Sequence, residues 1–102
     1  MNDTVDQRDL EKATVSAVNE IIREKAKYLD RWNRMAENGT PLEKLRARQM
    51  IEITNQSELN IFVPELAQLL LYEVTVLGAK TFEFVFMDGS RKRIQIGTAS
   101  AA

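Results

Sequence analysis

The fold is decided by residues 62–96, which read FVPELAQLLLYEVTVLGAKTFEFVFMDGSRKRIQI. Pro64 predicts the start of a short helix that runs to about residue 71, because proline fits the first helical turn. Alternating and β-branched residues then predict three strands, at residues 72–77, 81–87 and 91–96. The Asp88-Gly89 pair is a strong signal for a two-residue hairpin turn, so we expect an antiparallel meander.

The second predicted strand carries a row of aromatic side chains. Side chains alternate along a strand, so Phe82, Phe84 and Phe86 are expected on one face. An exposed row of this kind can stack nucleobases. A three-stranded sheet needs one covered face, however, and we therefore expect the row to pack on the preceding short helix. The apolar residues of that helix are Leu66, Leu69 and Leu70.

The preceding residues, 4–56, are expected to form a long antiparallel helical hairpin. Thr4 and Gln7 have the spacing of a capping box, and no proline or glycine interrupts the chain from there to about Glu37. A single helix over that span would be roughly 50 Å long, which indicates an extended arm or a coiled coil. Apolar residues recur along it at alternating three- and four-residue spacing, broken by Lys25: Val15, Val18, Ile22, Leu29, Trp32 and Ala36.

The turn of the hairpin has its own signals. Asn38-Gly39 predicts a left-handed helix stop, since glycine tolerates positive φ. A second helix follows at once, with Thr40 as its cap, Pro41 at its first position and Glu43 completing a capping box. So short a link makes the two helices antiparallel.

These elements together predict one α+β domain over residues 1–102. Its parts are the helical hairpin, the short helix with the meander, and a tail, at residues 4–56, 62–97 and 98–102.

Composition excludes several classes of function. The chain of 102 residues has a formal net charge of −1 and contains neither cysteine nor histidine. Their absence removes thiol nucleophiles, imidazole bases, disulfides and the common zinc sites. No glycine-rich phosphate-binding motif occurs either. We therefore expect no catalysis, no cofactor, no metal and no small-molecule substrate.

No apolar run approaches the ~20 residues of a membrane span, and the N-terminus lacks a signal-peptide pattern, so a cytoplasmic protein without membrane contact is expected.

An apolar group near the predicted hairpin tip is a candidate protein interface. Leu29, Trp32 and Leu42 lie there, where the shorter second helix cannot cover the whole stripe of the first. Trp32 can anchor a contact with a second copy of the chain or pack within its own chain. The unequal helix lengths favour self-association through the hairpin.

Two basic clusters are candidate contacts for DNA phosphates. The first comprises Lys44, Arg46 and Arg48, near Arg31 and Arg34, and the second comprises Arg91, Lys92 and Arg93 beside the Asp-Gly turn. Because the net charge is −1, any DNA contact must come from such a local patch. The alternatives are a solvated, salt-bridged helix face for the first cluster and a charged edge strand that discourages aggregation for the second.

The order of these motifs resembles the C-terminal region of the large serine recombinases. The matching patterns are R-W, a small-residue turn followed by P-L-x-x-x-R-A-R-Q, an E-L helix, V-T-V and F-x-F-x-D-G-S, at residues 31–32, 39–49, 64–71, 74–76 and 84–90. In that family this region closes the DNA-binding domain and carries a coiled-coil arm for subunit contacts during synapsis. The family's catalytic serine and zinc-ribbon cysteines have no counterpart in this sequence.

The resemblance thus implies a non-catalytic module for site-specific recombination. Its expected partners are other recombinase subunits, as a homo-oligomer through the hairpin, and DNA. A module that acts chiefly by contacting DNA remains open, and so does a stand-alone helical-hairpin adaptor unrelated to recombination.

Overall fold

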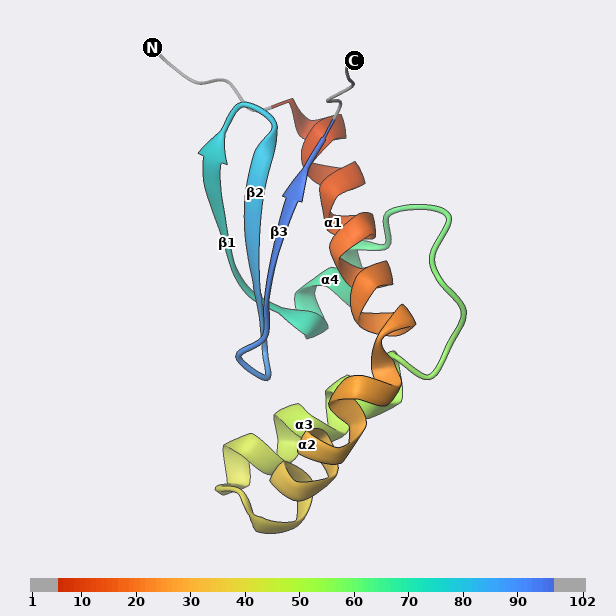
Figure 1. The fold of residues 1–102 in the computed structure, drawn as a ribbon, viewed down its shortest axis with the longest axis vertical. Coiled ribbons are helices and arrows are strands. Elements are labelled where there is room, and N and C mark those ends of the chain that lie inside the picture. The colour runs from red at the N-terminus through yellow and green to blue at the C-terminus, as the bar shows by residue number, and fades with distance from the viewer. Residues whose placement is uncertain (1–5, 97–102) are drawn as a thin grey trace.

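The computed structural model describes residues 6–96 (Figure 1). It is an α+β structure with four helices and one antiparallel sheet. The elements are α1 (Gln7–Arg23), α2 (Lys25–Asn38), α3 (Pro41–Ile53), α4 (Pro64–Leu70), β1 (Leu71–Gly78), β2 (Thr81–Phe86) and β3 (Arg91–Gln95). Thr4 of the predicted capping box and the predicted tail lie outside the described residues. Asp6 caps α1, accepting from the backbone N–H of Arg8 at 2.8 Å.

The sheet is the predicted meander, with strand order β1-β2-β3. Each strand begins and ends within one residue of its predicted bounds. The β2–β3 turn is closed by a 2.8 Å hydrogen bond from the Phe86 backbone N–H to the Ser90 carbonyl, and within it the Gly89 N–H donates to the Phe86 carbonyl at 2.9 Å. The turn therefore contains three residues, Met87 to Gly89, so the predicted two-residue turn was correct in position and wrong in length. Gly89 has a φ of 91° in this turn, a backbone conformation that strongly favours glycine.

Helix α1 covers the buried face of the sheet. Phe82, Phe84 and Phe86 are fully buried, as the alternation predicted. They pack in one core with the buried face of α1, which is formed by Ala13, Ala17, Val18 and Ile21. The prediction that α4 supplies this cover was wrong in its main part. Of the α4 leucines only Leu70 is buried, while Leu69 is 43% exposed, because α1 lies across β2 and β3.

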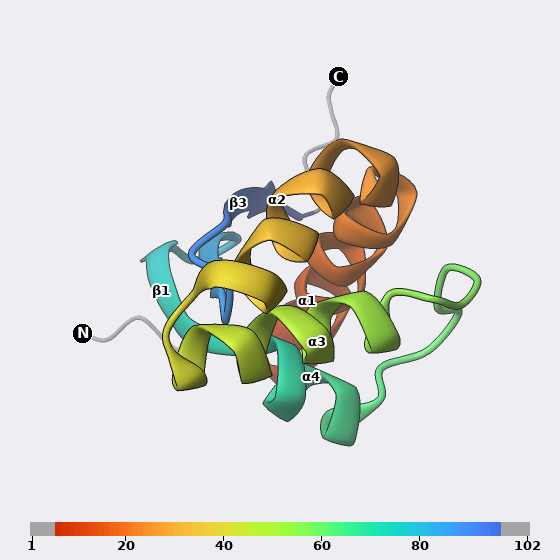
Figure 2. The same cartoon turned by 90° about the horizontal axis from the view of Figure 1, so that it is seen from below.

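The predicted single long helix is broken in two. At Glu24 the backbone has φ −96° and ψ 16°, and the chain bends between α1 and α2 (Figure 1). No proline or glycine marks this bend. It lets α1 follow the sheet while α2 packs beside the antiparallel α3, as Figure 2 shows from below. The hairpin is therefore formed by α2 and α3 alone.

Gly39 ends α2 for a different reason from the one predicted. Its φ of −76° and ψ of 178° are extended, so no left-handed stop is present. A Cβ atom at this position would lie 2.7 Å from the Met35 carbonyl oxygen and 2.8 Å from Glu43 Cβ. The chain needs glycine because these groups approach so closely. The capping box that follows is confirmed: Glu43 N–H donates to the Thr40 hydroxyl at 3.2 Å, and Thr40 N–H donates to the Glu43 carboxylate at 2.8 Å.

Candidate functional site

A buried carboxylate joins α2 to the β2–β3 turn. The Asp88 side chain has no exposed surface, and its Oδ2 atom accepts from three donors. These are the Trp32 indole N–H at 2.6 Å, the Arg31 guanidinium at 2.7 Å and the Ser90 hydroxyl at 2.7 Å. The Oδ1 atom accepts from the Ser90 backbone N–H at 2.9 Å. We call these four residues the Asp88 cluster.

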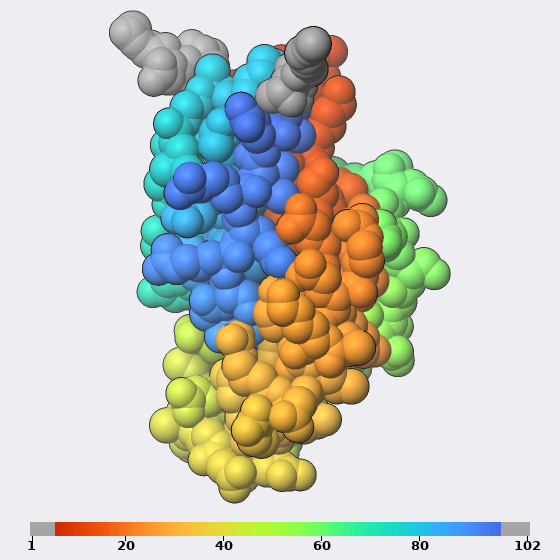
Figure 3. Space-filling view, viewed as in Figure 1, coloured from red at the N-terminus to blue at the C-terminus, as the bar shows by residue number. Residues whose placement is uncertain are grey.

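The Asp88 cluster acts as an anchor of the fold. Burial alone would raise the pKa of Asp88, but hydrogen bonds from Trp32 and Ser90 and the charge of Arg31 outweigh it. The pKa therefore lies below its ordinary value. The carboxylate is ionised at neutral pH with both oxygens occupied, so it has no proton to donate. Figure 3 shows the end of the β2–β3 hairpin resting directly on α2.

The predicted interface group is divided by the fold. Trp32 is fully buried within its own chain, so its assignment as a surface anchor was wrong. The physical reason is the turn at Asp88, which reaches the indole from 56 residues further along the chain. Leu29 is half-buried against the same core. Leu42 is 53% exposed and stands one helical turn from Leu45, which is 54% exposed.

The first basic cluster also separates. Lys44 and Arg48 are four residues apart on α3 and therefore share a face, and neither forms an ion pair within residues 6–96. Arg46 points elsewhere, with its guanidinium 5.6 Å from the Tyr72 ring centre. The two α2 arginines expected nearby are engaged: Arg31 in the Asp88 cluster and Arg34 with Asp30, at 2.9 Å.

The second basic cluster is split across the sheet. The Lys92 ammonium lies 2.6 Å from a Glu24 carboxylate oxygen, and the side chain is only 13% exposed. It points to the helix-covered side and does not present its charge at the surface. Arg91 and Arg93 lie on the opposite side because side chains alternate. Arg91 is 3.5 Å from Glu83, whereas Arg93 is exposed and has no ion pair in the described residues.

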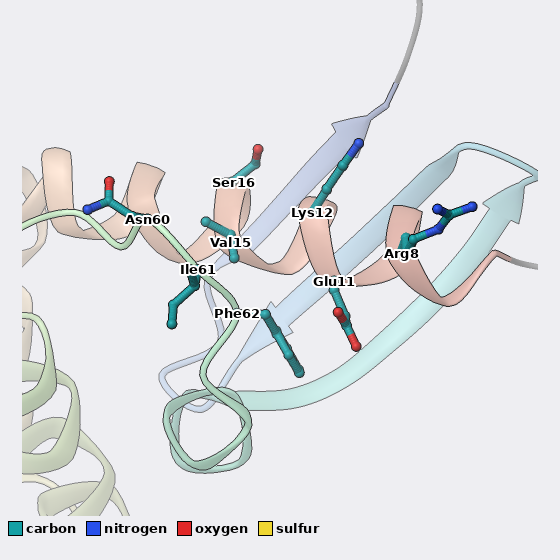
Figure 4. A pocket seen from close by; sticks show the side chains of 8 residues that line it. All are labelled: Arg8, Glu11, Lys12, Val15, Ser16, Asn60, Ile61 and Phe62. Carbon is teal, nitrogen blue, oxygen red and sulfur yellow. The ribbon is translucent and has the colours of Figure 1, made fainter.

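A groove of about 480 Å³ separates α1 from the loop at residues 54–63 (Figure 4). Asn19 ties this loop to α1 through two hydrogen bonds with the Leu59 backbone, at 2.6 and 3.0 Å. In Figure 4, Glu11 points toward Phe62 while Lys12 points to the other side of the helix. Glu11 is the one carboxylate of the lining. A lone carboxylate supplies neither an acid–base pair nor a magnesium or calcium site.

A second, smaller hollow lies between α3 and the sheet. Its volume is about 260 Å³. Arg46 and Tyr72 stack at its wall, and Gly89 of the β2–β3 turn closes one side. The residues that line the hollow include no carboxylate, and their one hydroxyl group is the phenol of Tyr72.

An exposed apolar strand is the feature that the sequence analysis missed. β1 forms one edge of the sheet, and α1 packs chiefly against β2 and β3. The exposed fractions are 61% for Tyr72, 36% for Val74, 46% for Val76 and 46% for Leu77. The available signal was that apolar residues occur at both odd and even positions of 71–77. This pattern fits a strand with cover on both faces.

Comparisons with known proteins leave the family open. No family model matches the chain, and no curated protein or solved structure is significantly similar to it. Within residues 6–96 no three acidic side chains gather as a metal site would require. In the same part of the chain, none of the helices has the length and apolar character needed to cross a membrane.

Proposed function

We propose that this chain is a non-catalytic C-terminal module of a large serine recombinase, acting in the cytoplasm. Its proposed role is to mediate subunit contacts during synapsis and to support DNA binding. One observation carries the proposal. The R-W and D-G-S motifs, which are the first and last in the recombinase-like series, meet in the Asp88 cluster through the 2.6 Å bond from Trp32 to Asp88.

That contact bears on the proposal because it makes the motifs interdependent. A chance likeness of scattered motifs gives no reason for distant members to bond with each other. Here Trp32 without Asp88 would leave a buried donor unpaired, and Asp88 without its donors would be a buried unpaired charge. The intervening P-L-x-x-x-R-A-R-Q motif begins α3, and its alanine, Ala47, is fully buried in the same core.

The DNA-binding part of the proposal relies on Lys44 and Arg48. These side chains have one helix face in common and form no ion pair within the described residues, so their charge is available to phosphates. Arg93 is a third available cation. By contrast, the Lys92 ammonium is held by Glu24.

A salt titration of duplex binding tests this part. The logarithm of the affinity should fall linearly with the logarithm of salt concentration, by about 0.9 for each phosphate contacted. The double variant Lys44→Gln/Arg48→Gln should make that slope less steep by about 1.8, which corresponds to the loss of roughly two phosphate contacts. The matched control is Arg91→Gln, which removes a cation that already faces Glu83. Binding that ignores salt, or a slope unchanged in the double variant, would contradict the DNA-binding role.

The assignment to recombinases has a separate test. A resolvase-type catalytic domain encoded upstream in the same reading frame would support it. The protein that contains both the catalytic domain and this module should then form a synaptic complex on recombination-site DNA. A gene that encodes only this module, with no recombinase nearby and no DNA binding, would favour the stand-alone adaptor instead.

A further inference from the structure

The two edges of the sheet differ in their protection. Edge strands offer unpaired backbone N–H and C=O groups, and proteins usually shield them with charge, proline or a covering element. β3 has this shielding: its sequence contains Arg91, Lys92 and Arg93, and α1 packs against it. β1 reads LYEVTVLG, has no proline or lysine, and contains a single charged residue, Glu73.

β1 exposes apolar side chains even on the face of the sheet that α1 covers. Val74 pairs with Phe84 and Val76 with Phe82 across the sheet, so both valines face the helix side. They nevertheless remain 36% and 46% exposed. The pairing of β1 with β2 is irregular only toward its two ends, between Leu71 and Glu73 and between Val76 and Gly78, and residues 73–76 are in regular register. An exposed, apolar edge of this kind is a template for pairing with another strand.

We propose that β1 pairs antiparallel with β1 of a second copy of this chain, giving a dimer with a continuous six-stranded sheet. Thr75 lies on the two-fold axis. Val74 then faces Val76 of the second copy, and Val76 faces its Val74. Glu73 faces Leu77 of the second copy. Opposite residues have the same parity, so both copies keep α1 on one side of the joined sheet.

The charges of β1 favour a second copy as the occupant. In this register the two Glu73 carboxylates are separated by four residues, which is about 13 Å along the strand. That distance exceeds the screening length of about 8 Å at physiological salt, so the like charges barely repel. All other opposed pairs are uncharged, and the strand is therefore complementary to itself.

Closure also favours a second copy. A two-fold β1 contact uses the same surface on both chains and leaves only β3 edges outside. Those edges are charged, with Arg91 and Arg93 exposed. The assembly thus stops at two copies, where an unprotected second edge would lead to a fibre. This inference deepens the subunit contact of the proposed function and rests on it for its role in synapsis, but self-association is measured on the chain alone.

Sedimentation equilibrium gives the first test. At roughly 100 μM the chain should have twice the monomer mass, since even a weak micromolar dimer is formed there. Val76→Lys should raise the dimer dissociation constant on the order of 100-fold, because a charge enters both symmetric valine pairs. Val76 is 46% exposed, so the variant should fold, which circular dichroism can verify. Ile61→Lys, at a 71% exposed position of the loop at residues 54–63, is the matched control and should leave the dimer intact.

Single cysteines give the second test, because the chain has none of its own. In the proposed register the Thr75 Cα atoms of the two copies are about 5 Å apart, within disulfide range. Thr75→Cys should therefore form a covalent dimer on mild oxidation. Glu73→Cys, at about 13 Å from its counterpart, and Arg93→Cys, on the other edge, should not.

The outcomes separate this inference from the proposed function. A wild-type monomer at the stated concentration overturns the dimer, and so does a Val76→Lys variant that still dimerises, or equal cross-linking at positions 73 and 75. A monomer that gains mass only with another protein assigns the edge to a heterologous strand and likewise overturns it. None of these results alters the salt-dependent DNA binding by which the recombinase module is tested.

Discussion

The indole N–H of Trp32 donates a 2.6 Å hydrogen bond to the carboxylate of Asp88. This bond connects α2 to the turn between β2 and β3. It helps to hold the helical pair α2–α3 against the sheet, so that both contribute to one core. Along the chain, α2 is connected to the sheet-covering helix α1 through the bend at Glu24. The contacts of Asp88, Gly39 and Lys92 lead to four predictions about the stability of the protein.

Replacing Asp88 by asparagine should destabilise the protein strongly. The change removes the charge that accepts from Trp32 and faces Arg31, and it leaves the buried donors with a weaker acceptor. We expect a loss of about 2–4 kcal/mol in the free energy of unfolding. Urea denaturation measures it. The control is Asp30→Asn, which breaks an exposed pair with Arg34 and should cost less than about 0.5 kcal/mol. Equal effects of the two substitutions would show that the Asp88 cluster does not stabilise the fold.

The contribution of Asp88 should also depend on pH. Its folded-state pKa is depressed below the ordinary value of 3.8 that applies in the unfolded chain. The stability it provides is therefore fully present above pH 3.8 and is lost as the pH falls through the lower folded-state value. The difference in unfolding free energy between wild type and Asp88→Asn should shrink over that acid window, with a slope of at most ~1.4 kcal/mol per pH unit. Stability curves recorded for both proteins from pH 7 to pH 2 test this, and parallel curves would contradict it.

Gly39 should not tolerate a methyl group. Its backbone angles are ordinary, so the cost in Gly39→Ala comes from the 2.7 Å approach to the Met35 carbonyl oxygen and the 2.8 Å approach to Glu43 Cβ. We expect a loss of about 1–3 kcal/mol, typical of overpacking, seen as a lower melting temperature. Gly78→Ala is the matched control, since a Cβ there meets nothing within 4 Å. A melting temperature unchanged in Gly39→Ala would show that the turn relaxes at little cost.

Lys92 and Arg93 are adjacent but should respond differently to substitution by methionine. Lys92 bonds Glu24 at 2.6 Å and lies 5.5 Å from the Tyr28 ring centre, whereas Arg93 is exposed. Lys92→Met should cost about 1 kcal/mol because it removes the ion pair with Glu24 at the bend, although the Glu24 carboxylate is 38% exposed and still accepts from the Tyr28 hydroxyl. Arg93→Met should stay within about 0.5 kcal/mol of wild type. Guanidinium denaturation compares the two, and similar losses would mean that the bend does not depend on this ion pair.

Local sequence signals determined the elements of this protein. The capping box of Thr40 and Glu43, the Pro64 helix start, the position of the turn at Asp88-Gly89 and the alternation of Phe82 to Phe86 were all predicted and all occur in the structure. Each depends on atoms within about four residues of one another, so the chain itself contains the necessary information. The candidate site was less predictable for the same reason. Its cations were identifiable, but their availability depends on distant partners.

Tertiary contacts decided the rest. The bend at Glu24 has no local breaker and coincides with the long-range bond to Lys92. The sequence around Trp32 is compatible with a surface anchor. In the structure the turn at Asp88, which lies 56 residues further along the chain, contacts the indole and buries it. The exposure of β1 depends on where α1 lies across the sheet. An apolar residue in the sequence has the same tendency to be buried whether its cover comes from its own chain or from another. Only the packing of distant elements decides which faces are left open.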